Sequence, residues 1–217
     1  MAKSAEEIFN FAKNLNKPIS RVIVTHAHPD HWFGNSFFAD CDIFALPQVK
    51  TDMEKDAVTA FERNKPHLGD LIGDKAILPN KILEPEFSLD DVTFKVHEVK
   101  NTEAAFIALL EIESEKILFA SDLAYGKMHL YIAENHIGEW IKALENLQSK
   151  NYAYVFAGHG AANSPDVLEQ TKTYLKQAES ELKRSKNFAE FEEKMLQLYP
   201  DYDGRTLLKA NGMFLKF

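Results

Sequence analysis

Three imidazoles and one carboxylate lie within six consecutive positions of this sequence: His26, His28, Asp30 and His31. Imidazole nitrogens and carboxylate oxygens are donors that zinc and other divalent transition metals bind in proteins. A single histidine would be interpreted as structural, but four donors in one short run indicate a metal site. His26 with His28 predicts a first cation, and Asp30 with His31 predicts a second beside it. We expect one or two ions, with zinc (Zn2+) favoured and iron or manganese as alternatives.

The residues before and after this run predict that it follows the end of a buried strand, which is a common place for a functional site. Residues 21–25 are mostly β-branched and show no polar alternation, which predicts a strand buried on both faces. The small residues Gly34 and Asn35 follow the histidines. Ligands of open α/β sheets gather at the carboxyl ends of strands, where this cluster is expected. Upstream, Ser4 begins a capping pattern for an amphipathic helix that extends to Leu15.

The rest of the sequence alternates helical patterns with apolar runs. It predicts a strand over 42–46, a helix over 47–64, loops with short strands over 65–90, strands over 92–99, 104–112 and 116–120, a helix over 137–147, a strand over 152–157 and one or two exposed helices over 166–198. This α/β pattern suggests two sheets packed face to face under helices, although it does not separate that sandwich from a doubly wound sheet. The 217 residues are expected to form one domain, 1–217.

Composition argues against several classes of function. A formal net charge of -8 and a pI near 5.5 lack the excess of lysine and arginine that nucleic-acid binding requires. Cys41 is the only cysteine, so neither an intramolecular disulfide nor a cysteine cluster for zinc is expected, and a cytoplasmic location is favoured. The first residues turn acidic where a secretion signal would turn apolar, and no segment has the ~20 apolar residues of a membrane span.

The run from Thr25 to His31, Thr-His-Ala-His-Pro-Asp-His, resembles the His-x-His-x-Asp-His signature of the metallo-β-lactamase superfamily. Two later motifs support this resemblance. Residues 117–123, Ile-Leu-Phe-Ala-Ser-Asp-Leu, resemble the family's strand that ends in an aspartate between the metals. Residues 155–160, Val-Phe-Ala-Gly-His-Gly, resemble its strand that ends in Gly-His. The order and rough spacing agree from about Pro18 to Ser164.

The resemblance implies a four-layer αββα sandwich and a metallohydrolase in which a metal-bound hydroxide attacks the substrate. It also implies a role for each ligand: His26 and His28 bind the first metal, Asp30, His31 and His159 bind the second, and Asp122 lies between the two. Asp30 is in addition the implied catalytic residue, because in such sites it orients the attacking water or protonates the leaving group.

One ligand of the family pattern is absent from this sequence. Asn101 stands where the third histidine of the first metal site is expected, and an amide oxygen is a weak zinc ligand. Glu103 and His129 are the candidate replacements, and the sequence does not choose between them. The other histidines are expected to be structural or exposed: His67, His97 and His136.

The family's first strands also have no counterpart before the histidine run. The first sheet is therefore expected to be short, with unpaired backbone groups at its edge. Three explanations stay open: residues 206–209 and 213–215 of the C-terminal tail fill the gap, the chain forms a homo-oligomer, or the sequence is a fragment.

Two functions are compatible with these features. The first is a metal-dependent hydrolase acting on a small ester, thioester, lactone or amide, with a small molecule as its partner rather than a nucleic acid or a membrane. Hydrolysis of β-lactams themselves is not expected, because those enzymes resemble secreted proteins. The alternative is a metal- or ligand-binding protein of the same fold whose catalysis is lost or altered, which the absent third histidine would permit.

Overall fold

The apolar runs of the sequence form strands in two separate sheets of the computed structural model, which describes residues 1–217. The first sheet has the order β1-β2-β3 and contains short parallel strands: β1 (Val22–Ile23), β2 (Ile43–Ala45) and β3 (Lys81–Ile82). The second has the order β4-β5-β6-β7-β8: β4 (Glu86–Leu89), β5 (Val92–Lys100), β6 (Phe106–Ile112), β7 (Ile117–Tyr125) and β8 (Tyr154–His159). The first sheet is short, as expected.

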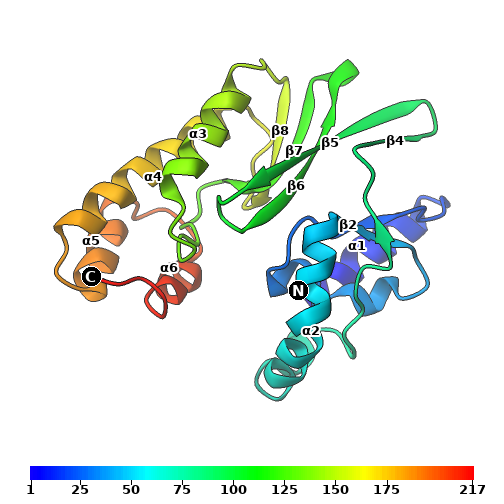
Figure 1. The fold of residues 1–217 in the computed structure, drawn as a ribbon, viewed down its shortest axis with the longest axis horizontal. Coiled ribbons are helices and arrows are strands. Elements are labelled where there is room, and N and C mark those ends of the chain that lie inside the picture. The colour runs from blue at the N-terminus through cyan, green and yellow to red at the C-terminus, as the bar shows by residue number, and fades with distance from the viewer. The chain divides into compact units, whose positions relative to one another are not determined.

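Each sheet belongs to its own compact unit of the chain. Unit 1 comprises Met1–Pro85 and unit 2 comprises Glu86–Phe217. In Figure 1, unit 1 carries the blue and cyan end of the colour range, and unit 2 runs from green to red. The single-domain organisation expected from the sequence stays a prediction. No helix in either unit combines the length and apolar composition that a transmembrane span requires.

Unit 1 places two α-helices with its sheet, α1 (Ala2–Asn14) and α2 (Pro47–Leu68). α2 connects β2 to β3, as the parallel pairing of these strands requires. Trp32 and Phe33, directly after the histidine run, pack with Phe61 of α2. The ring centroids lie 4.5 Å apart for Trp32 and Phe33 and 5.3 Å apart for Phe33 and Phe61. These aromatic side chains therefore form part of the unit 1 core.

Two details of unit 1 differ from the sequence expectation. α1 begins before Ser4, because Met1 is its N-cap and the Met1 carbonyl accepts a hydrogen bond from the Ala5 amide at 2.9 Å. Ala2 and Lys3 are good helix formers, so the helix includes them. β1 is also shorter than the apolar run, and its residues are only half-buried, since it is an edge strand that pairs with β2 alone.

The sheet of unit 2 brings two strand ends together. β4 to β7 pair antiparallel in sequence order, whereas β7 and β8 pair parallel. Parallel neighbours end at the same edge of a sheet, so the carboxyl ends of β7 and β8 lie side by side. Tyr125, at the end of β7, is the register partner of His159, at the end of β8. This edge carries the candidate ligands of unit 2.

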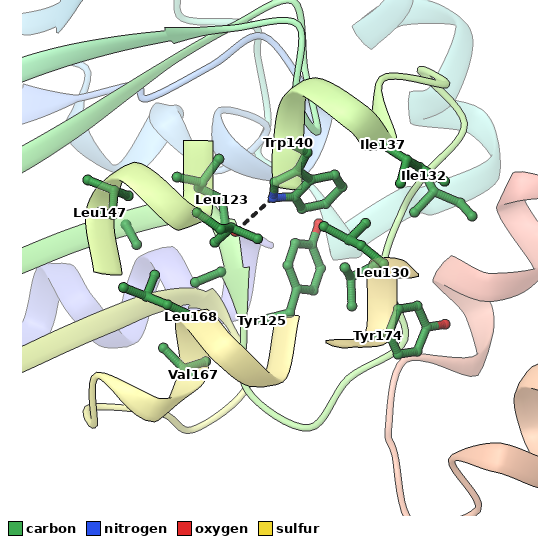
Figure 2. Packing of buried hydrophobic residues seen from close by; sticks show 14 of the residues in the cluster. Leu123, Tyr125, Leu130, Ile132, Ile137, Trp140, Leu147, Val167, Leu168 and Tyr174 are labelled. Atoms are coloured by element: carbon green, nitrogen blue, oxygen red, sulfur yellow. Dashed lines mark hydrogen bonds between the residues drawn. The ribbon is translucent and has the colours of Figure 1, made fainter. Parts of the chain in front are cut away.

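Four α-helices complete unit 2: α3 (Ile137–Gln148), α4 (Asp166–Arg184), α5 (Phe188–Leu198) and α6 (Arg205–Asn211). α3 and α4 lie side by side, and α4 packs against β7 and β8 (Figure 1). The core of unit 2 contains residues of β7, α3 and α4, and in Figure 2 the indole of Trp140 donates a hydrogen bond to the carbonyl of Leu123, at 2.9 Å. This packing fixes β7 close to its functional end.

The C-terminal tail does not supply a strand. Residues 206–209 lie in α6 and residues 213–215 have no strand structure, so one of the three explanations for the short first sheet, that the tail fills the gap, is wrong. The side chain of Asn211 accepts a hydrogen bond from the Ile132 amide at 2.7 Å and donates one to the Leu130 carbonyl at 3.0 Å. These two bonds are buried and anchor α6 within unit 2.

Candidate metal centre

The histidine run forms a compact cluster within unit 1, which we name the N-terminal cluster: His26, His28, Asp30 and His31. The ring of His26 lies 4.8 Å from that of His28 and 4.0 Å from that of His31, centroid to centroid. The Nε2 atom of His31 lies 3.5 Å from Oδ2 of Asp30. The four side chains therefore converge, as the sequence predicted, and form a candidate metal-binding His/Asp cluster.

The backbone of this run turns tightly after β1. Pro29 opens a single 3-10 turn, and the amide of Phe33 donates to the Pro29 carbonyl at 2.8 Å. The indole of Trp32 donates to the Ala27 carbonyl at 3.1 Å. The hydroxyl of Thr25 lies 3.2 Å from Nδ1 of His26. Such outer contacts fix the orientation of a ligating imidazole, and they would leave Nε2 as the nitrogen for a metal.

Unit 2 contributes a second group of donors, which we name the C-terminal cluster: Glu103, Asp122 and His159. The Nε2 atom of His159 lies 3.1 Å from Oδ2 of Asp122. The hydroxyl of Tyr125 donates to the same Oδ2 at 2.9 Å and lies 3.5 Å from Oε1 of Glu103. The structure thus brings together two ligands predicted from distant motifs and one of the two proposed replacements.

The approach of β7 to β8 at this point depends on Gly158. A Cβ atom at position 158 would lie 2.0 Å from Oδ1 of Asp122 and 2.6 Å from the carbonyl carbon of Ser121. No side chain fits at such distances, so only glycine permits the two strands to come this close. The two residues of the Gly-His motif therefore have different roles. Gly158 leaves space for the side chain of Asp122, and His159 contacts that side chain.

Asn101, which stands where the family's third histidine is expected, lies in the loop between β5 and β6. Asn101 is exposed and adopts a left-handed conformation, with φ of 51°. Asparagine tolerates this conformation better than most residues. The Asn101 amide donates to the Ala105 carbonyl at 3.0 Å and closes the turn. Glu103 at the tip is only 1% exposed and directs its carboxylate to Tyr125. This geometry favours Glu103 as the replacement donor.

His129 lies in a different part of unit 2. It is fully buried, its Nδ1 atom lies 2.9 Å from the hydroxyl of Tyr174, and its ring contacts that of Tyr202. Burial lowers the pKa of His129, and the nearby charge of Arg205 lowers it further. These contacts hold the imidazole in an aromatic cluster with α4. His129 is therefore the weaker candidate for a metal ligand.

The other histidines occupy the places expected of structural or exposed residues. His67 is exposed in the last turn of α2, and His136 is the N-cap residue of α3. The imidazole of His97 on β5 contacts the carboxylate of Glu111 on the neighbouring strand β6. This cross-strand pair stabilises the sheet and lies outside the C-terminal cluster.

The buried state of His129 predicts a pH dependence of stability. In the unfolded chain this imidazole takes up a proton below its ordinary pKa of 6.5, whereas the folded protein resists protonation because the pKa is lowered. Its contribution to stability is therefore complete above pH 6.5 and is lost as the pH falls below that value. We expect urea unfolding of metal-free protein to show a smaller loss of stability between pH 7.5 and 5.5 in His129→Gln than in the wild type. Equal losses would contradict this assignment.

The donor set of both clusters fits a divalent metal. Imidazole and carboxylate are the donors of zinc sites, and the chain places them in two groups without a thiolate. Within unit 2, Asp122 and Glu103 both approach the one hydroxyl of Tyr125. Two carboxylates this close repel each other, and a cation between ligands of this kind offsets the repulsion.

In sequence profile and in fold, the chain is similar to proteins of one superfamily. The sequence profile of the Metallo-beta-lactamase superfamily matches residues 4–159. No curated protein matches the chain in sequence. Among solved structures, the chain is similar to a metallo-beta-lactamase from Pontibacter korlensis, with 18% identity, a TM-score of 0.63 and coverage of 79% of this chain and 76% of that chain. It is also similar to a metallo-beta-lactamase from Hirschia baltica, with 22% identity, a TM-score of 0.56 and coverage of 77% and 73%.

A third similar structure covers more of the chain. This beta-lactamase domain protein from Burkholderia ambifaria has 16% identity and a TM-score of 0.62, and the alignment covers 90% of this chain and 68% of that chain. Identities this low speak for the fold alone. The predicted fold class, a mixed α/β protein with two sheets of the metallo-β-lactamase type, is confirmed. With its family profile matched over residues 4–159, the chain belongs to the metallo-β-lactamase superfamily.

Proposed function

We propose that this protein is a metal-dependent hydrolase that acts on a small ester, thioester, lactone or amide. The observation that carries the proposal is the contact between Asp122 and His159 at adjoining strand ends, 3.1 Å apart, in a chain that also holds the N-terminal cluster. Because the superfamily typically binds divalent metals, the side chains of both clusters are the candidate metal ligands. Zinc is the first candidate for the ion.

The proposed ligand sets divide the donors between two metal positions. For the first metal the family motif implies His26 and His28, and we assign Glu103 as their third partner. For the second metal the same motif implies Asp30, His31 and His159 as ligands, and Asp122 would lie between the two ions. Glu103 takes the place of the absent histidine in this assignment. A carboxylate in that place is a harder and more acidic donor than imidazole, so iron or manganese would compete with zinc better than in a site with three histidines.

The bound cation would supply Lewis acidity, which polarises an acyl oxygen and makes a water molecule acidic near neutral pH. The residues of the chain would do the rest. Asp30 is exposed, unlike Asp122, and in the proposed mechanism its carboxylate would orient a water or give a proton to the leaving group. The net charge of -8 disfavours strongly anionic substrates, so an uncharged or mildly polar acyl compound is the proposed class.

Metal analysis and activity together test this function. Protein purified without added metal is expected to contain one or two bound ions and to hydrolyse a member of an ester, thioester and lactone panel. This activity should be lost on chelation and regained with zinc. Bound metal without any hydrolysis would favour the alternative, a metal-binding protein with lost catalysis. Absence of both bound metal and zinc affinity would contradict a metal site altogether.

A further inference from the structure

Tyr125 contacts every donor of the C-terminal cluster. Its hydroxyl lies 2.9 Å from Oδ2 of Asp122 and 3.5 Å from Oε1 of Glu103. Its ring stacks on the imidazole of His159, with centroids 5.1 Å apart and an interplanar angle of 28°. The side chain is 2% exposed. One buried residue therefore adjoins donors that belong to both proposed metal positions.

The rest of unit 2 holds Tyr125 in place. The Tyr125 amide donates to Oγ1 of Thr171 on α4 at 3.1 Å, and the Thr171 hydroxyl lies 3.4 Å from the Tyr125 carbonyl. The ring of Trp140 lies 6.2 Å from that of Tyr125, and Figure 2 shows both rings in the same core. The backbone and the ring are thus fixed by the packing of α3 and α4, so little conformational entropy is lost when the hydroxyl holds a ligand.

We propose that Tyr125 is a positioning residue that sets the geometry of both metal positions, an inference that rests on the proposed function. A phenol has one proton, and the shorter contact assigns it to Oδ2 of Asp122. This bond fixes the rotation of the carboxylate and so determines which oxygen lone pairs face a metal. Outer hydrogen bonds of this kind orient metal ligands and raise metal affinity.

The contact with Glu103 extends the effect of Tyr125 to the first metal position. The same hydroxyl oxygen limits how far the Glu103 carboxylate approaches Asp122, and the ring limits the tilt of His159. Loss of the hydroxyl therefore loosens donors of both sets at once. Loss of Glu103 alone, by contrast, removes a donor from the first set only.

Zinc titration of metal-free protein against a chelating indicator tests this role. Tyr125→Phe keeps the ring on His159 and removes only the hydroxyl, and we expect its affinity to fall about 10- to 100-fold at both positions. Glu103→Gln is expected to weaken one position. The absorption spectrum of the Co2+-loaded protein is a second measurement, because it reports ligand geometry directly and is expected to change in Tyr125→Phe.

Tyr174→Phe is the matched control. Tyr174 is also buried, and its hydroxyl also contacts a side chain, Nδ1 of His129 at 2.9 Å. Both variants lose a buried hydroxyl, so similar changes in thermal stability with a loss of zinc affinity in Tyr125→Phe alone would support the proposal. Wild-type affinity and spectrum in Tyr125→Phe, beside tight zinc binding by the wild type, would overturn this inference alone. A wild type without zinc affinity would overturn the proposed function and this inference with it.

Discussion

Replacement of Asp122 by asparagine is expected to abolish hydrolysis and to reduce the zinc content of the protein. Asparagine keeps the volume of the side chain and can accept the hydrogen bond from Tyr125, but its amide is a poor zinc ligand and carries no charge. Charge stabilisation by a correctly held metal is worth several kcal/mol. At about 1.36 kcal/mol per factor of ten, kcat/KM should fall roughly 10³-fold or more.

Three measurements separate this loss from misfolding. Thermal unfolding of the metal-free Asp122→Asn protein should occur at the wild-type temperature or above it, because the variant removes a carboxylate that is 1% exposed and lies close to Glu103. Zinc titration should show weaker binding, and kcat/KM should fall. Asp91→Asn, an exposed residue in the turn before β5, is the matched control and should change none of the three. Full activity in Asp122→Asn would exclude Asp122 from the site.

The N-terminal cluster was predictable from sequence because its members are neighbours in the chain. Side chains of one short turn after a strand stay close together. The ring of His26 lies 4.0 Å from that of His31 and 4.8 Å from that of His28. Asp122 and His159 are 37 residues apart in sequence, and neither is distinctive alone. The resemblance to a family motif identified them, and the parallel pairing of β7 and β8 explains physically why they meet.

Tyr125 was missed because the end of β7 does not follow the regular alternation of a strand. The sequence pattern placed the strand end at Ala120, yet β7 continues to Tyr125 through two irregularities in its pairing with β8. Ser121 has φ of 46°, a left-handed conformation that shifts the side chains beyond it relative to the sheet. The signal available in sequence was an aromatic residue three positions after the aspartate, which is too common to be assigned a role without the pairing register.

The choice between Glu103 and His129 also required the structure. Both follow a strand that leads to the site, and imidazole is the better zinc ligand by residue type. The structure favours Glu103 instead, because His129 packs with Tyr174 and Tyr202, while the loop at Asn101 turns Glu103 towards Tyr125. Helices and strands were predicted well where apolar periodicity was strong, as in α3 and β6. The explanation that the C-terminal tail supplies a strand was wrong because residues 206–209 fit an amphipathic helix as well as a strand.

Gly158→Ala is expected to damage both the fold of unit 2 and the C-terminal cluster. The new methyl group would meet Oδ1 of Asp122 at 2.0 Å and two backbone atoms of β7, the Ser121 carbonyl carbon at 2.6 Å and the Asp122 nitrogen at 2.8 Å. A flexible side chain could move away, but the backbone of a central strand cannot do so cheaply. Overpacking of this kind costs about 1–3 kcal/mol. The same displacement turns the Asp122 carboxylate away from its hydrogen bond with Tyr125.

A matched glycine substitution elsewhere in unit 2 shows whether the damage in Gly158→Ala comes from the close approach of β7 and β8 or from the change to alanine itself. Gly138 lies in α3, and a Cβ atom there would have no neighbour within 4 Å. Gly138→Ala should therefore be neutral or stabilise the protein by up to about 1 kcal/mol, since alanine favours a helix. Gly158→Ala should lower the unfolding temperature by roughly 2–12 °C for a chain of this size and weaken zinc binding. Wild-type zinc binding and unfolding temperature in Gly158→Ala, as well as in Gly138→Ala, would contradict this prediction. They would mean that β7 and β8 do not approach as closely as the contact between Asp122 and His159 requires.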